Sequence, residues 1–431
     1  MSVVGATFLP GGVLMDFSVL EVCAGAGGQS LGLHQAGFRH SLAVEIDERA
    51  AETLRTNLGV KVAIGDAADP YVWKPSDYKG VTLLAGGVPC PPFSAAGKQL
   101  GSSDERDLFA WAIEQVGVLE PRAVMLENVR GLAGPRFSGY RQRVLDRLFE
   151  FGYVGEWKLL TSADFGVPQL RPRFVLVAMR FEDQQYFRWP EPTVSEHVSI
   201  GEALFDLMSA NGWKHAEEWR ALASGVGPTI VGGSKKHGGA DLGPTRAKAA
   251  WAKLFVDGKG VVEEAPGPDA PSALVKPPRL TVEMVARVQG WGAEDGWEFS
   301  GKKTAQYRQV GNAFPPPVAK AIGERILSAL LHQGEPRTDL AHSASLHDPI
   351  YRALSRSEEG LTLADLVKEH NKDSEARVQQ YLTALKHDFD LQEVVDEAGQ
   401  IRFKLGEFRG FVGQQDHQRH DFFLTQRQKI S

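Results

Sequence analysis

The sequence predicts an α/β protein built on a largely parallel sheet, and three observations carry this prediction. Short apolar runs recur along the first half of the chain, several of them end directly in glycine or a carboxylate, and helical apolar patterns separate them. Runs of this kind are typical of buried strands, and strands that alternate with helices are typical of parallel sheets. The 431 residues are enough for two or three domains around a large core.

The composition indicates in which compartment the protein works and which kinds of binding site it can have. The chain has two cysteines, Cys23 and Cys90, and a formal net charge of −6. Two cysteines without metal-ligand spacing favour a reducing compartment, so we expect a cytoplasmic protein with no metal centre. No signal peptide and no apolar run of about 18 residues is present, which argues against secretion and membrane insertion. The negative charge means that any contact with nucleic acid requires a local basic surface.

The first strand is expected at residues 17–22, where it leads into the glycine-rich turn Cys23-Ala24-Gly25-Ala26-Gly27-Gly28 and a helical pattern. Strand, glycine turn and helix are typical of the first unit of a nucleotide-binding fold, because glycine lets a ligand approach the backbone. A second strand, 41–45, ends in Glu45, about 20 residues further on, at the spacing of an acid that binds ribose hydroxyls. A solvated surface acid is the alternative.

Two acidic residues follow in the same unit. Asp47 is expected to cap the next helix. A third strand, 60–64, ends before Gly65-Asp66, which would bring Asp66 near an adenine edge.

A candidate nucleophile follows the strand expected at 81–85. That strand ends in Gly86-Gly87 and leads into Val88-Pro89-Cys90-Pro91-Pro92. Because proline fixes φ, Cys90 stands on a stiff turn, whereas most free cysteines are buried apolar residues. The segment 94–104 is polar and contains glycine, so it is expected to be a loop that closes over a substrate; a plain surface loop is the alternative.

Polar groups also follow two later strands. The strand at 123–126 ends at Glu127-Asn128, and Glu127 is a candidate general acid, since ligands of α/β sheets bind at the carboxyl ends of strands. Arg171 and Arg173 precede the strand at 174–178 and, two residues apart on an extended segment, should point the same way. A guanidinium there can grip a carbonyl oxygen or a phosphate, unless these are ordinary surface arginines.

The pattern loosens between residues 189 and 275, and this region holds the local basic surface. Lys235 and Lys236 lie among glycines, and Arg246 and Lys248 follow closely. Such residues on loops suit contacts with phosphates and base edges, with a solvated basic loop as the alternative.

The remaining chain completes the predicted organisation. A helix follows three prolines after Gly311-Asn312, and beyond a polar linker three amphipathic stretches precede a hairpin, which suggests a winged-helix module. The predicted parts are a catalytic domain at 1–188 and 276–331, a target-recognition region at 189–275, a linker at 332–348, the module at 349–405 and a tail at 406–431.

Taken in order, these motifs resemble the motif set of the DNA cytosine-5 methyltransferases over residues 17–331. The resemblance implies a Rossmann-like sheet that binds S-adenosylmethionine and a duplex DNA substrate. It implies that Cys90 adds to C6 of a flipped cytosine, that Glu127 hydrogen-bonds N3 and the exocyclic amine, and that Arg173 holds O2. Asn128 would support the Pro-Cys loop, and Arg171 the polar network around it.

The resemblance also assigns two sets of binding residues. Those for the cofactor are Cys23, Ala24, Gly25, Gly27, Gly28, Glu45, Ile46, Asp66, Pro89, Leu108 and Asn312. Those for DNA are Ser94, Lys98, Gln99, Lys235, Lys236, Arg246 and Lys248. The chain departs from the family pattern at Cys23, where phenylalanine is usual, and at Pro91, where glutamine is frequent.

Other functions remain open from the sequence. An RNA cytosine-5 methyltransferase, a catalytically silent DNA-binding regulator and a nicotinamide oxidoreductase are the alternatives. The size of the region at 189–275 favours duplex DNA over RNA, and the Pro-Cys motif has no role in an oxidoreductase. We expect a monomer that works beside a cognate restriction endonuclease acting on the same site.

Overall fold

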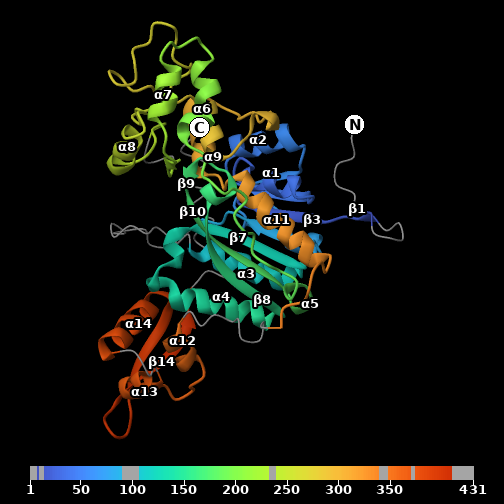
Figure 1. Ribbon diagram of the computed structural model, residues 1–431. Helices are drawn as coiled ribbons and strands as arrows, with labels where there is room; N and C mark the ends of the chain where they lie inside the picture. Colours follow the sequence, from blue (N-terminus) through green and yellow to red (C-terminus); the bar gives the residue numbers. More distant parts are fainter. Residues whose placement is uncertain are drawn as a thin grey trace.

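The computed structural model describes residues 7–8, 14–89, 106–232, 239–338, 348–369 and 374–409. Its centre is a seven-stranded sheet in the order β5-β4-β3-β6-β7-β10-β8 (Figure 1). The strands are β3 (Ser18–Val22), β4 (Arg39–Glu45), β5 (Val62–Ile64), β6 (Leu83–Gly86), β7 (Ala123–Val129), β8 (Tyr153–Thr161) and β10 (Pro172–Arg180). The first five strands pair in parallel, and β10 runs antiparallel to both neighbours. The predicted α/β sheet is confirmed.

The strand order reverses between β3 and β6, since the chain continues from β3 to β4 on one side and later returns to β6 on the other. Ligands of open α/β sheets bind at such a switch point. One prediction near it was wrong in detail: Glu127 and Asn128 lie inside β7 rather than after its end. The reason is that β10 pairs along the whole of β7, with Phe174 opposite Asn128 and Arg173 opposite Val129.

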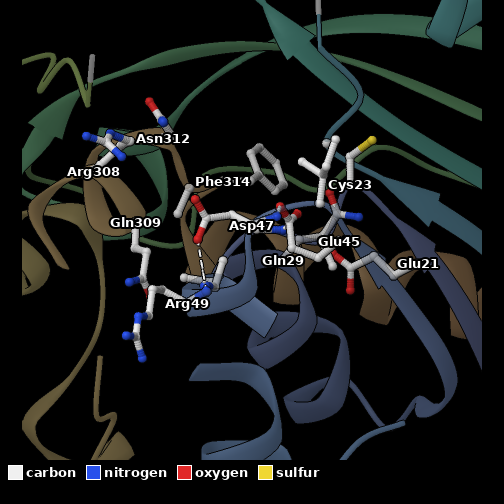
Figure 2. Close-up of a pocket in the computed structure, with 18 of the residues that line it drawn as sticks. Glu21, Cys23, Gln29, Glu45, Asp47, Arg49, Arg308, Gln309, Asn312 and Phe314 are labelled. Carbon is white, nitrogen blue, oxygen red and sulfur yellow. Dashed lines mark hydrogen bonds between the residues drawn. The ribbon is translucent and has the colours of Figure 1, made fainter. Parts of the chain in front are cut away.

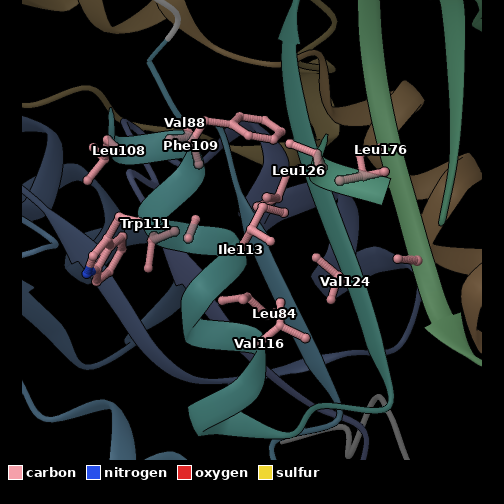
Figure 3. Packing of buried hydrophobic residues seen from close by; sticks show 14 of the residues in the cluster. Leu84, Val88, Leu108, Phe109, Trp111, Ile113, Val116, Val124, Leu126 and Leu176 are labelled. Carbon is pink, nitrogen blue, oxygen red and sulfur yellow. The ribbon is translucent and has the colours of Figure 1, made fainter. Parts of the chain in front are cut away.

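Helices cover both faces of the sheet. The principal ones are α1 (Gly28–Gln35), α2 (Glu48–Leu58), α3 (Arg106–Leu119), α4 (Ser138–Glu150) and α11 (Pro316–Leu330). Helix α3 buries its apolar side against β6 and β7, where Ile113 and Val116 lie beside Leu84 and Val124 (Figure 3). Asp47 caps α2 as predicted, because its carboxylate accepts the N–H groups of Arg49 and Ala50.

Helices α1 and α11 approach closely on the other face, beside the glycine turn. A Cβ added to Gly28 would lie 2.3 Å from the Phe314 carbonyl oxygen, and one on Gly32 would lie 2.3 Å from that of Pro316. Only glycine fits at such distances, so the turn and the residues around Phe314 are held against each other.

A second group of helices has its own core. It consists of α6 (Ile200–Ser209), α7 (Ala216–Leu222), α8 (Thr245–Ala252), α9 (Val282–Gln289) and α10 (Lys303–Asn312), and it joins the sheet domain through the short parallel pair β9 (Gln169–Leu170) and β11 (Gly227–Pro228). Buried residues from α7, α8, α9 and α10 share one cluster, including Trp219, Trp251, Val285 and Tyr307. Helices α9 and α10 therefore contribute to this core although the predicted recognition region stops at residue 275, and the domain boundaries stay a prediction.

The C-terminal elements form a separate small unit below α4 in Figure 1. They are α12 (Pro349–Ser355), β12 (Leu361–Thr362), α13 (Leu363–Glu369), α14 (Glu375–Asp388), β13 (Phe389–Val395) and β14 (Ile401–Phe408), with sheet order β12-β14-β13. This order is compatible with the predicted winged helix, which stays a prediction. Residues 406–408 belong to β14 and not to the predicted tail, because Phe408 lies against Tyr140 of α4 at a ring distance of 5.8 Å.

The remaining elements are short. They are β1 (Thr7–Phe8), β2 (Leu14–Met15), α5 (Phe181–Gln184) and the 3-10 turns η1 (Pro75–Tyr78), η2 (Arg130–Ala133), η3 (Pro135–Phe137), η4 (Ser162–Phe165) and η5 (Ala293–Asp295). Across the described ranges, no helix is long and apolar enough to cross a membrane. The same ranges contain no cluster of three or more His, Cys, Asp or Glu side chains arranged to bind a metal ion.

Candidate active site

Two adjoining cavities, each of about 600 Å³, lie at the carboxyl ends of β3, β4, β6 and β7. Figure 2 shows residues that line the first of them. Seven residues line both: Cys23, Gly25, Glu45, Ile46, Gly87, Glu127 and Asn312. Because they share these walls, we treat them as one site and call it the switch-point cavity. It occupies the position expected from the reversal of strand order.

The glycine turn forms one wall. Its backbone is left-handed at Cys23 (φ 53°), Gly25 (φ 57°) and Gly27 (φ 88°). Position 27 requires glycine for two reasons: its φ is positive, and an added Cβ would lie only 2.6 Å from the Leu54 side chain. Cys23 adopts the same region without being glycine, which is a strained conformation of the kind that concentrates at functional sites.

Glu45 links the turn to the start of α2. Its Oε2 accepts the Gly25 N–H at 2.7 Å, and its Oε1 accepts the Asp47 N–H at 2.8 Å. Burial raises the pKa of the Glu45 carboxyl, and these backbone donors oppose the rise. Each carboxylate oxygen has a second lone pair, so Glu45 can still accept hydroxyl donors from the cavity.

The other predicted cofactor residues surround the same space. Ile46 stays 43% exposed at the cavity edge, and Asp66 is buried, accepting the Ala68 N–H at 3.1 Å. Leu108 and Pro89 line the part near β6. Asn312, Gly28 and Ala24 line the part near α1 and α10. Gly27 belongs to the same turn but does not line either cavity.

Glu127 and Arg173 form an ion pair in the cavity wall, with Arg173 Nε 3.3 Å from Glu127 Oε2. Both side chains are buried, and within the described structure neither atom has a hydrogen-bond partner of good geometry. Burial raises the pKa of the Glu127 carboxyl, although the charges of Arg173 and Arg171 act to lower it. The site therefore holds an acid whose proton is retained to higher pH than in ordinary glutamate.

Asn128 and Arg171 support the site through backbone contacts. Asn128 Nδ2 donates to the Val88 carbonyl oxygen at 3.1 Å, which holds the segment leading to Cys90. Arg171 donates from Nη1 to Ile230 O at 2.7 Å and from Nη2 to the carbonyl oxygens of Gly311 and Ala313 at 2.8 and 3.1 Å. Arg171, which lies between β9 and β10, thus holds the end of α10 that carries Asn312.

Several predicted residues lie outside the described ranges: Cys90, Ser94, Lys98, Gln99, Lys235 and Lys236. Pro89, the residue before Cys90, lines the cavity. Arg246 is exposed on α8. Lys248 is instead paired with Asp241, with Nζ 2.8 Å from Oδ2, so its charge is partly neutralised within the protein.

Several residues of the cavity wall were not predicted from the sequence, among them Glu21, Gln29, Arg308 and Phe314. The side-chain amide of buried Gln29 has no hydrogen-bond partner at either atom among the described residues. A signal existed for Arg308, which stands four residues before Asn312 on α10 and therefore on the same helix face. The sequence contains no such signal for Phe314, because the position of this residue depends on the close approach of α11 to α1.

Comparisons with known proteins agree with this geometry. A family model described as C-5 cytosine-specific DNA methylase matches residues 17–328. The chain is 56% identical over 421 residues to the Type II methyltransferase M.NaeI of Lentzea aerocolonigenes, a match covering 97% of this chain and 100% of that protein. It is 48% identical over 318 residues to the Type II methyltransferase M.NgoMIV of Neisseria gonorrhoeae, covering 73% of this chain and 99% of that protein.

A solved structure of a putative DNA modification methyltransferase from an Escherichia coli prophage matches with a TM-score of 0.51 and 22% identity, covering 73% of this chain and 100% of that one. This likeness supports the fold alone. The family model and the M.NaeI match span most of the chain, and the chain therefore belongs to the C-5 cytosine-specific DNA methylase family.

Proposed function

We propose that this DNA cytosine-5 methyltransferase transfers a methyl group from S-adenosylmethionine to C5 of a flipped cytosine in duplex DNA, through a covalent bond between Cys90 and C6. The Glu127–Arg173 pair carries the proposal. It offers a buried acid and a buried guanidinium, each with a polar atom that makes no hydrogen bond within the described structure, in a cavity that Pro89 also lines. A cytosine presents an N3 acceptor and an O2 acceptor to match these two groups.

The residues present fit the proposed cofactor. Glu45 has acceptor capacity for ribose hydroxyls, the left-handed glycine turn lets a ligand approach its backbone, and the Gln29 amide is buried with both polar atoms unpaired. Ile46 and Leu108 offer apolar contacts to a flat ring. When bound, S-adenosylmethionine supplies an electrophilic methyl group.

In the proposed reaction the Cys90 thiolate attacks C6 of the cytosine, and Glu127 gives its proton to N3 as electrons move into the ring. C5 becomes nucleophilic and takes the methyl group. A base then removes the C5 proton, Cys90 leaves C6, and N3 returns its proton to Glu127. Arg173 holds O2 through its guanidinium, and Asn128 fixes the Val88 carbonyl, two residues before Cys90 in the chain.

We also propose that DNA is recognised by residues 189–275 and that the enzyme protects a site cut by a cognate restriction endonuclease. The relatives named Type II methyltransferase support a partner endonuclease. Exposed Arg246 supports DNA recognition by residues 189–275, whereas the ion pair with Asp241 makes Lys248 a weaker candidate for a DNA contact.

The test is methylation of plasmid DNA by the purified full chain, read by bisulfite sequencing, with wild type, Cys90→Ser and Cys23→Ser compared. A serine alcohol is a far weaker nucleophile than a thiolate, so Cys90→Ser should bind S-adenosylmethionine and not methylate. Cys23→Ser should still form the covalent adduct on DNA containing 5-fluorocytosine. Methyl transfer at the wild-type rate by Cys90→Ser, or methylation of another base or atom, would reject the proposal.

A further inference from the structure

Helix α10 presents an arginine to the switch-point cavity. Ala305, Arg308 and Asn312 all line this cavity, and their spacings of three and four residues place them on one face of the helix. Arg308 is partly buried, and Figure 2 shows it beside Asn312. Since a guanidinium stays protonated in proteins, this part of the cavity wall carries a positive charge.

Four arginines line the switch-point cavity in the described part of the chain: Arg49, Arg171, Arg173 and Arg308. The first three are engaged within the protein. Arg49 and Arg173 each pair with a glutamate, at 3.0 and 3.3 Å, and Arg171 donates to three backbone carbonyl oxygens. Arg308 forms no ion pair and no hydrogen bond through its side chain with any residue that the structure describes. Its charge is therefore available to a ligand.

Carboxyl groups surround this charge in the same part of the cavity, which is lined by Glu21, Glu45, Asp47, Glu48 and Glu127. Such a wall attracts cations and repels an anion that approaches alone. The proposed cofactor, S-adenosylmethionine, carries a sulfonium and an α-ammonium group that suit this wall, and one α-carboxylate that does not. The carboxylate therefore requires a positive partner, and among the described arginines Arg308 is the one not already engaged.

A phosphate of DNA is the other anion to consider at this edge of the cavity. A phosphate brings no positive charge of its own, so the five carboxyl groups oppose its approach to Arg308. The two cationic groups of the cofactor offset the same carboxyl groups. The charge balance of the cavity therefore favours the carboxylate of the cofactor over a phosphate.

We propose that Arg308 binds the α-carboxylate of S-adenosylmethionine and thereby sets the affinity of the enzyme for ligands that carry this group. The inference rests on the proposed use of S-adenosylmethionine. A planar guanidinium donates two parallel hydrogen bonds to a carboxylate, a geometry that neither lysine nor glutamine reproduces. Because the carboxylate lies outside the reacting groups, Arg308 acts in binding and not in the methyl transfer.

The experiment measures Kd by calorimetry for three ligands of the purified full chain. They are S-adenosylmethionine, S-adenosylhomocysteine and decarboxylated S-adenosylmethionine, which keeps the adenosine, sulfonium and amine but lacks the carboxylate. Wild type is compared with Arg308→Gln, Arg308→Lys and the control Arg49→Gln. Arg49 lines the same cavity and carries the same charge, but it is already paired with Glu52. DNA binding is measured by fluorescence anisotropy at several salt concentrations without cofactor.

Arg308→Gln should raise Kd for S-adenosylmethionine and S-adenosylhomocysteine about tenfold, the loss expected for a charged hydrogen bond at a partly exposed site. Its Kd for the decarboxylated cofactor should be no higher than that of wild type, because this ligand has no group for Arg308 to bind. Arg49→Gln should leave all three Kd values unchanged. The salt dependence of DNA binding should be the same in Arg308→Gln and wild type.

Arg308→Lys keeps the charge and should bind the two ligands with a carboxylate more tightly than Arg308→Gln does. Should Arg308→Gln fail to fold, the comparison is made with Arg308→Lys alone. Its Kd should then rise about threefold for these two ligands, through the lost second hydrogen bond, and stay unchanged for the decarboxylated cofactor.

An unchanged Kd for S-adenosylmethionine in a folded Arg308→Gln, or an equal loss for the decarboxylated cofactor, would overturn the inference. A salt slope reduced by about 1 with unchanged cofactor Kd would also overturn it and would assign Arg308 to a phosphate. These results leave the methyltransferase assignment intact. That assignment is tested through wild type and Cys90→Ser, so the two failures are distinguishable.

Discussion

Glu127 and Arg173 meet across the antiparallel strands β7 and β10, with Arg173 Nε 3.3 Å from Glu127 Oε2. In the register of this pair Glu127 faces Val175, and Arg173 stands two residues before Val175 in β10, so the side chains of Glu127 and Arg173 lie on one face of the sheet as diagonal neighbours. An acid and a guanidinium are thus held side by side on rigid strands at the wall of the switch-point cavity.

Glu127→Gln should lower kcat by about 10²-fold or more, because an amide cannot deliver the proton to N3. Since burial raises the pKa of Glu127, the protonated form persists above the usual range for glutamate, and wild-type kcat/KM should fall as pH rises through that pKa. The variant should lack this falling limb. The measurement is kcat/KM against pH for both proteins, and identical alkaline limbs would remove Glu127 from the acid role.

The raised pKa of the Glu127 carboxyl also predicts that the stability of the protein changes with pH. A carboxyl whose pKa is raised by folding contributes stability at low pH that is lost as pH rises through the folded-state value. The free energy of unfolding of wild type should therefore decrease relative to that of Glu127→Gln over this interval. Urea titrations at several pH values check this, and a difference of the opposite sign would contradict it.

Gly87→Ala should reduce catalysis while leaving the fold intact. A Cβ there would lie 3.0 Å from Glu127 Oε1 and 3.6 Å from the Cys23 carbonyl oxygen, so the Glu127 carboxyl, the proposed acid, must shift. We expect a fall in kcat with little change in Tm. Gly267→Ala is the control, because no heavy atom lies within 4 Å of its added Cβ. Full kcat in Gly87→Ala would show that the carboxyl has room to move without loss.

Arg246→Ala and Lys248→Ala should differ in their effect on DNA binding. Arg246 is exposed, so its loss should weaken binding and reduce the slope of log K against log salt by about 1 if it contacts a phosphate. Lys248 is paired with Asp241, so its loss should change the slope less. Fluorescence anisotropy at several salt concentrations checks this, and equal slopes for the two variants would contradict it.

Truncation after Gln333 should leave methylation and target sequence unchanged, because M.NgoMIV is covered over 99% of its length by 73% of this chain. Thermal stability should fall. The module contacts α4 through a 2.6 Å hydrogen bond from Ser138 Oγ to Asp348 Oδ2, and Leu385 fills the space beside Gly139. A truncated protein that is folded and binds S-adenosylmethionine but does not methylate DNA would show that the module takes part in DNA engagement.

Local chemistry determined much of this protein from the sequence alone. The strands from β3 to β7 and their order with helices follow from apolar runs bounded by glycine, and the cap at Asp47 follows from its place before a helix. The cavity residues at the ends of β3, β4 and β6 were predictable for the same reason, since parallel strands bring their carboxyl ends to one edge of a sheet.

Contacts between distant segments were decided only by the tertiary structure. Glu127 lies inside β7 because β10 pairs along the whole of that strand. Phe314 lines the cavity because α11 packs against glycines of α1. Lys248 forms an ion pair with Asp241. The Tyr307 hydroxyl lies within hydrogen-bond distance of the Val231 and Asp241 carbonyl oxygens, more than 60 residues away in sequence. No local pattern specifies such partners, because hydrogen bonds and close packing depend on which surfaces the whole fold brings together.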